Sequence, residues 1–104
     1  MSKDNGGPAS DRELLEMAAK AAGVELVTPT MIDHDLWNPL DDDGDALRLA
    51  VKLELDILRF PAFGEAQVCS QDGVADEAES TSICPYAATR RAIVRAAAAI
   101  GSAM

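Results

Sequence analysis

Aromatic residues are scarce in this sequence: its 104 residues include one tryptophan, one tyrosine and two phenylalanines. A hydrophobic core must therefore be filled mainly by leucine, isoleucine, valine and alanine. The chain also lacks a long apolar run. The longest, residues 96–100, is mostly alanine and falls far short of the roughly 18 residues that a membrane span needs. We therefore expect no transmembrane segment.

Side chains suited to metal binding or redox chemistry are equally few. His34, Cys69 and Cys84 show no spacing typical of a zinc site, so we expect no metal and no cofactor. Residues 1–9 contain no signal-peptide apolar region and are expected to form a flexible lead to a single domain, residues 10–104. This predicts a cytoplasmic protein with free thiols, although the sequence leaves open whether the two cysteines pair.

Positive charge is missing from two long stretches. Residues 33–45 contain six aspartates and no base, residues 60–89 contain five acidic residues and no base, and the net charge is −9. Direct binding to nucleic acid is therefore not expected, because phosphate neutralisation requires a basic face. A hydrophobic content of 48% also argues against a disordered acidic tail. The acidic excess either keeps the domain soluble or attracts a basic partner.

Three helices are predicted. Ser10 and Glu13 match a capping box ahead of an apolar run, and Gly23 suits the left-handed residue that ends a helix, so the first helix lies between them. The second begins near Asp43–Asp45, where carboxylates complement the helix dipole. The third opens at Pro85, because proline is favourable at the first helical position.

Strands are predicted between the helices. Residues 24–28 are short and β-branched, and residues 31–32 resume the extended path. The strict alternation of residues 53–57 indicates a change from helix to strand, and residues 58–60 and 66–69 form the arms of a hairpin.

The fold class follows from this order of elements. We expect a small α+β domain with about three helices packed on one face of a short antiparallel sheet, in the order α-β(β)-α-β-β-α. The polar, acidic residues 71–82 are expected to form a mobile loop.

Helical spacing predicts which side chains are buried. Leu47 and Val51 are expected to line the core from the second helix, and Ile93 and Ile100 from the last. Ala96–Ala99 give the last helix a slim profile, which lets another helix or a second copy of the chain approach closely.

The run Asp41–Asp45 invites comparison with a calcium-binding EF-hand loop, but its spacing rejects that interpretation. With Gly44 as the sixth loop residue, the first and twelfth positions are Pro39 and Ala50, which carry no carboxylate. Helix capping explains part of the cluster. The remaining crowding of like charges favours a partner-binding role for three residues, Asp41, Asp42 and Asp43.

Four further side chains are candidates for function. Trp37 is either a plug at the end of an aromatic-poor core or an interface anchor. Arg91 and Arg95 share a face of the last helix, where they either neutralise carboxylates of the same chain or bind a partner. His34 lies between two aspartates, an arrangement that can orient a general base, but no nucleophile motif accompanies it, so we expect a solvated turn histidine. No catalytic residue is predicted, and the chain is not expected to be an enzyme.

Two segments resemble small uncharacterised proteins of tailed bacteriophages and prophages: Trp37-Asn38-Pro39-Leu40, continued by residues 43–53, and residues 86–97. The layout is also similar, more distantly, to the NinX-like phage family, which has an aromatic-Asn-Pro turn, an Asp-Ala helix start and a late helix with an Arg-Ala-Ala core. The likeness covers most of residues 11–104, but residues 71–82 depart from it. It implies an accessory protein acting in the infected or lysogenic bacterium, and it transfers no site residue.

These observations predict a non-enzymatic phage accessory protein that binds a host or defence protein through its acidic surface. A partner with a basic, nucleic-acid-binding groove is electrostatically matched to such a surface, and an anti-CRISPR or other anti-defence inhibitor is the concrete form of this hypothesis. The alternative is a self-associating structural phage protein, a homodimer through the alanines of the last helix.

Overall fold

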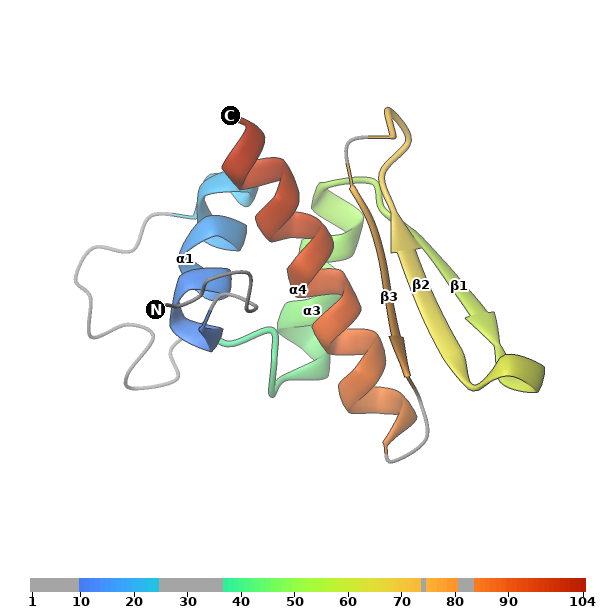
Figure 1. The fold of residues 1–104 in the computed structure, drawn as a ribbon. Coiled ribbons are helices and arrows are strands. Elements are labelled where there is room, and N and C mark those ends of the chain that lie inside the picture. Colours follow the sequence, from blue (N-terminus) through green and yellow to red (C-terminus); the bar gives the residue numbers. More distant parts are fainter. Residues whose placement is uncertain (1–9, 25–36, 74, 81–83) are drawn as a thin grey trace, which may run out of the picture.

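The computed structural model describes residues 10–24, 37–73, 75–80 and 84–104. Within them, helices and strands follow one another in the order α1, α3, β1, β2, β3, α4 (Figure 1). The helices lie on one side of an antiparallel sheet, which confirms the predicted α+β class. The lead, His34 and nearly all of the two strands expected before the second helix lie outside the described residues.

Helix α1 (Asp11–Ala22) begins and ends where the sequence predicts. The Ser10 hydroxyl accepts a hydrogen bond from the Glu13 N–H at 3.2 Å, and the Glu13 carboxylate accepts one from the Ser10 N–H at 3.1 Å. Gly23 has a φ of 72°, and the next N–H bonds back to the Ala19 carbonyl at 2.9 Å. Both ends of α1 are therefore capped by local sequence.

Helix α3 (Asp43–Lys52) is also followed by a left-handed residue, but that residue is a glutamate and not a glycine. Glu54 has a φ of 54°, and the Leu55 N–H bonds to the Ala50 carbonyl at 2.9 Å. A left-handed residue here turns the chain sharply, and strand β1 (Asp56–Phe60) starts two residues later. The predicted change from helix to strand within residues 53–57 is confirmed.

The sheet has the order β1-β2-β3. The short 3₁₀ turn η2 (Pro61–Phe63) joins β1 to β2 (Glu65–Cys69), which confirms the predicted hairpin. Strand β3 (Asp76–Ser80) corrects the expectation of a mobile loop over residues 71–82. Its sequence, Asp-Glu-Ala-Glu-Ser, has no β-branched residue, so local propensity gave no strand signal. Pairing with β2 makes it a strand.

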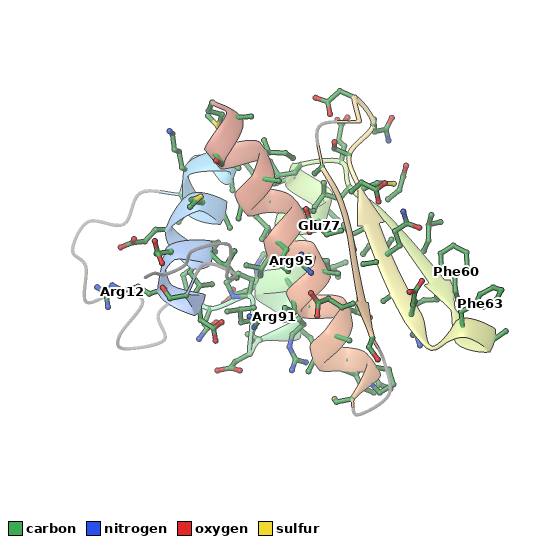
Figure 2. All side chains as sticks on the ribbon, viewed as in Figure 1. Arg12, Phe60, Phe63, Glu77, Arg91 and Arg95 are labelled. Atoms are coloured by element: carbon green, nitrogen blue, oxygen red, sulfur yellow. The ribbon has the colours of Figure 1, made fainter. Side chains whose placement is uncertain are left out.

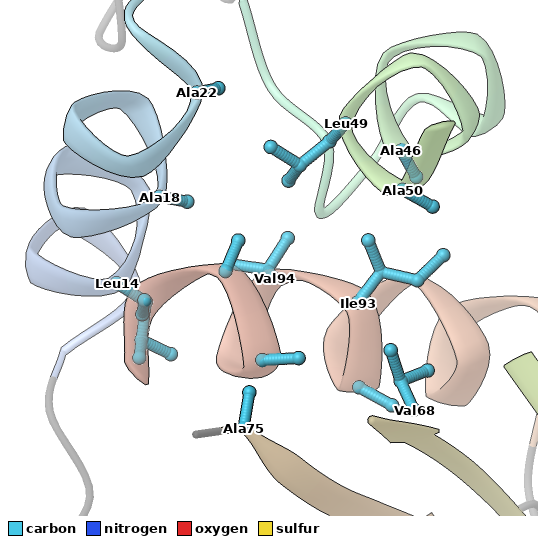
Figure 3. Packing of buried hydrophobic residues seen from close by; sticks show 14 of the residues in the cluster. Leu14, Ala18, Ala22, Ala46, Leu49, Ala50, Val68, Ala75, Ile93 and Val94 are labelled. Carbon is cyan, nitrogen blue, oxygen red and sulfur yellow. The ribbon is translucent and has the colours of Figure 1, made fainter. Parts of the chain in front are cut away.

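Helix α4 (Pro85–Ala103) is the centre of the molecule. It packs against α1 and α3 on one side and against β2 and β3 on the other (Figures 1 and 3). Ile93 and Val94 are buried toward α3 and α1, and Val68 and Ala75 face them from the sheet side (Figure 3). No helix in the described part of the chain is long and apolar enough to cross a membrane.

The small residues of α4 pack against other elements of the same chain. Ala92 and Ala96–Ala98 are buried, and a Cβ added at Gly101 would lie 2.0 Å from the Met17 carbonyl oxygen of α1. The close approach predicted for these alanines is therefore made between α4 and α1. Ala96–Ala98, which the sequence also offered as a contact between two copies of the chain, are buried within one copy.

Two of the predicted core residues lie on the surface. Leu47 is 59% exposed and Val51 is 68% exposed. Helix α3 instead buries the opposite set, Ala46, Leu49 and Ala50. Apolar residues occur on more than one face of this helix, and the face with two alanines allows the closer approach to α4. Among the positions predicted on α4, Ile93 is buried and Ile100 is half-buried.

Candidate protein-binding surface

The acidic cluster at the start of α3 is held by its own hydrogen bonds. The Asp42 carboxylate caps α3 by accepting from the Asp45 N–H at 2.7 Å. Asp45 accepts from the Asn38 N–H at 3.0 Å and pairs with Arg48 at 2.7 Å. Asn38 also donates to Asp41 from its side-chain amide at 3.4 Å. Helix capping and turn formation therefore account for more of the aspartates in this cluster than the sequence indicated.

Asp43 connects α3 to α4. Its carboxylate lies 2.6 Å from Arg90 Nη1, and Arg90 Nε donates to the Leu40 carbonyl at 2.7 Å. The side chain of Asp43 remains 71% exposed, and Asp41 and Asp42 are exposed as well. Their charges therefore face solvent, although each carboxylate has a partner within the chain.

Arg91 and Arg95 lie apart from this acidic cluster, on the flank of α4 that faces α1 and β3. Arg91 pairs with Asp11 of α1 at 3.1 Å. Arg95 lies beside Glu77 of β3 (Figure 2), with 2.7 Å between Arg95 Nη2 and Glu77 Oε1, and it also pairs with Glu79. Both arginines therefore neutralise carboxylates of the same chain, and their binding to a partner stays a prediction.

Trp37 belongs to the turn before α3 and is half-buried against the hydrophobic core. The next apolar residue of that turn, Pro39, is fully buried. The structure therefore brings Trp37 and Asp41–Asp43 together at one end of α3, while Arg91 and Arg95 lie on another side of α4.

An exposed apolar patch adjoins the acidic cluster. We define it as four exposed side chains, Leu47, Val51, Ile57 and Tyr86. Leu47, Ile57 and Tyr86 line one shallow groove of about 200 Å³, with Asp43 and Arg90 at its border. Val51 lies one turn along α3 from Leu47. A contiguous group of exposed apolar side chains marks an interaction site, whereas single ones need no explanation.

Sequence reasoning missed this patch because it placed Leu47 and Val51 in the core. A signal was present: α3 carries more apolar residues than one face of a short helix can bury. No sequence signal indicated that Ile57 and Tyr86 belong to the patch, because they lie on β1 and α4 and meet α3 only after folding.

Within the described residues, no group of three or more histidine, cysteine or acidic side chains is arranged to hold a metal ion. No protein-family profile, curated protein or solved structure matches the chain. The likeness to phage proteins therefore stays a prediction, and functional argument rests on the surface itself.

Proposed function

We propose that this chain is a bacteriophage accessory protein that acts by binding, without catalysis, to a basic host or defence protein in the bacterial cytoplasm. The observation that carries the proposal is the apolar patch bordered by exposed aspartates at the start of α3. The phage setting comes only from the resemblance of two sequence segments.

The patch has the composition of a binding hot spot. Tyr86 is 72% exposed, and tyrosine is enriched among residues whose truncation weakens protein complexes. Leu47 and Ile57 supply apolar area around a groove into which a partner side chain can insert. Burial of these side chains in a complex removes apolar surface from water, which is the main favourable contribution to most associations.

The charge of the surface selects the kind of partner. Asp43 lines the groove, Asp41 and Asp42 are exposed in the same turn before it, and the whole chain carries a net charge of −9. Like charge disfavours acidic proteins and nucleic acid, whereas a basic surface gains in association rate. A protein with a basic nucleic-acid-binding groove fits this requirement.

The apolar patch is tested by affinity capture with matched variants. Leu47→Ser with Val51→Ser removes apolar surface from the patch, while Met104→Ser changes a residue of the same 68% exposure as Val51 at the far end of α4. Each immobilised protein is incubated with lysate of the bacterium whose genome carries the gene. We expect a basic protein to be captured by the wild type and by Met104→Ser, and about tenfold or more weaker capture by the double variant. Equal capture by all three would refute the patch.

The acidic border is tested separately with the captured protein in purified form. Asp41→Asn, Asp42→Asn and Asp43→Asn together keep the capping geometry and remove three charges. We expect the association rate to fall about tenfold at low salt and the effect to shrink as salt is raised. A control that neutralises three acidic residues elsewhere, Glu16, Glu65 and Asp76, should change the rate less. An equal change in both variants would show that only net charge matters.

A further inference from the structure

The two edges of the sheet differ in how they are protected. At the β3 edge, Arg95 pairs with Glu77 and Glu79 and also donates to the Ala78 carbonyl at 3.3 Å. Charged side chains and a covering helix are the means by which proteins block strand edges from further pairing. The β3 edge is therefore occupied by contacts within the chain.

In the part of the chain that the structure describes, the β1 edge has no comparable ion pairs to a covering helix, and its own charged side chains, Asp56 and Arg59, are exposed. Strand β1 pairs with β2 on one side, and no described strand or helix pairs with its other side (Figure 1). Asp56, Ile57, Leu58 and Arg59 are all exposed. An unpaired strand edge presents backbone N–H and C=O groups that a second extended segment can bind.

We propose that the partner binds by adding an extended segment to β1 as a fourth, antiparallel strand. This inference rests on the proposed function and names the mode of binding. Ile57 connects the two parts of the surface, because it belongs to β1 and also lines the apolar groove with Leu47 and Tyr86. A segment paired with β1 therefore places one of its side chains over that groove.

The side chains of β1 define the chemistry of that segment. Opposed residues on neighbouring strands lie on the same face, where opposite charges and apolar pairs are favourable. The complement therefore has a basic residue opposite Asp56, an acidic residue opposite Arg59 and apolar residues opposite the three remaining positions, Ile57, Leu58 and Phe60. Arg59 has no ion pair with any described residue, so its charge is available.

A second copy of the chain fits this edge poorly. Antiparallel self-pairing centred on Leu58 would set Asp56 opposite Phe60 and Ile57 opposite Arg59 of the other copy. Centring on Arg59 would oppose like charges, and centring on Ile57 would set Asp56 opposite Leu58. The net charge of −9 on each copy adds repulsion. The edge is therefore matched to a different protein.

The test uses a synthetic peptide with the complementary pattern, acetyl-Thr-Val-Glu-Val-Val-Lys-Thr-amide, and the full-length chain. We expect saturable binding, with hydrogen exchange of alternate backbone amides in residues 56–60 slowed by about tenfold or more in the complex. Two control peptides have the same sequence with backbone N-methyl groups, one at the odd positions and one at the even positions. The control peptide that lacks the N–H groups paired with β1 should bind about tenfold more weakly than the unmethylated peptide.

Exchanging the charged residues of the peptide and of β1 tests which residues lie opposite one another. A second peptide with its Lys and Glu exchanged should bind the wild type less tightly than the first. Asp56→Lys with Arg59→Glu alters two exposed side chains and should reverse this preference. Reversal supports the register, and an unchanged preference overturns it.

Failure of strand addition is separable from failure of the proposed function. Absence of binding by the first peptide, or binding without protection of the β1 amides, overturns strand addition. Capture from lysate that depends on Leu47 and Val51 would then still support the apolar patch. Loss of that dependence, with peptide binding intact, would instead refute the patch and leave the strand edge as the binding site.

Discussion

The contact between α1 and α4 allows a demanding test of the fold. Gly101 lies where the two helices are closest, and a Cβ there would lie 2.0 Å from the Met17 carbonyl oxygen and 2.9 Å from its carbonyl carbon. Both atoms belong to the main chain, so no side-chain rotation relieves the overlap. The helices must separate by roughly 1.4 Å to restore ordinary van der Waals contact.

The cost of Gly101→Ala follows from two opposing effects. Overpacking typically destabilises by about 1–3 kcal/mol, and a clash with backbone belongs near the upper end of that range. Alanine is favoured over glycine inside a helix by at most about 1 kcal/mol, and less in a last turn. We therefore expect a net loss of about 2 kcal/mol in the free energy of unfolding, or a decrease in Tm of about 8–15 °C for a domain of this size.

Urea and thermal denaturation followed by far-UV circular dichroism measure this loss. Gly44→Ala is the matched control, because the atoms nearest to its Cβ would be side-chain ends, of Asp42 and Arg48, at 3.2–3.3 Å. The Arg48 end can move and the Asp42 carboxylate, which caps α3, needs to shift by only a few tenths of an ångström, so the control should stay within about 1 kcal/mol of the wild type. A Gly101→Ala variant of wild-type stability would show that α1 and α4 do not cross this closely.

Three further predictions concern helix ends, helix faces and cation binding. Glu54→Gly should stabilise the fold by about 1 kcal/mol, because glycine adopts the positive φ of this position without strain; a lower urea midpoint would contradict the assigned helix end. Ile93→Ala should cost about 2–4 kcal/mol and Val51→Ser less than about 0.5 kcal/mol, since the first side chain is buried and the second exposed. Equally large losses for both variants in thermal melts would restore the inward face of α3 predicted from sequence. Calorimetry should find no micromolar calcium affinity at residues 41–45, because the loop lacks its first and last ligands and the carboxylates of Asp42, Asp43 and Asp45 cap α3 or pair with arginines.

Local signals decided where α1 begins and ends and where α3 and α4 begin. Ser10 and Glu13 form their capping box from residues that are neighbours in sequence, and Gly23 ends α1 because glycine tolerates a left-handed conformation. Pro85 similarly opens α4. These interactions span at most a few residues, so the sequence alone was sufficient to predict them.

Strand β3 shows where local reasoning fails. Nothing in Asp76–Ser80 favours extended structure by propensity. Its pairing with β2 and the contacts of Glu77 and Glu79 with Arg95 come from residues distant in sequence. The pairing of distant segments stabilises this strand, and no window of sequence contains that information.

The candidate binding surface divides in the same way. The sequence determined its acidic border, because Asp41, Asp42 and Asp43 are adjacent in the chain wherever it folds. Only the tertiary structure decided that α3 turns Leu47 and Val51 outward, since periodicity identifies an apolar face but not the neighbour that covers it. Close packing of α4 against the alanine face of α3 left those side chains exposed, and Leu47 lines the groove together with Ile57 of β1 and Tyr86 of α4.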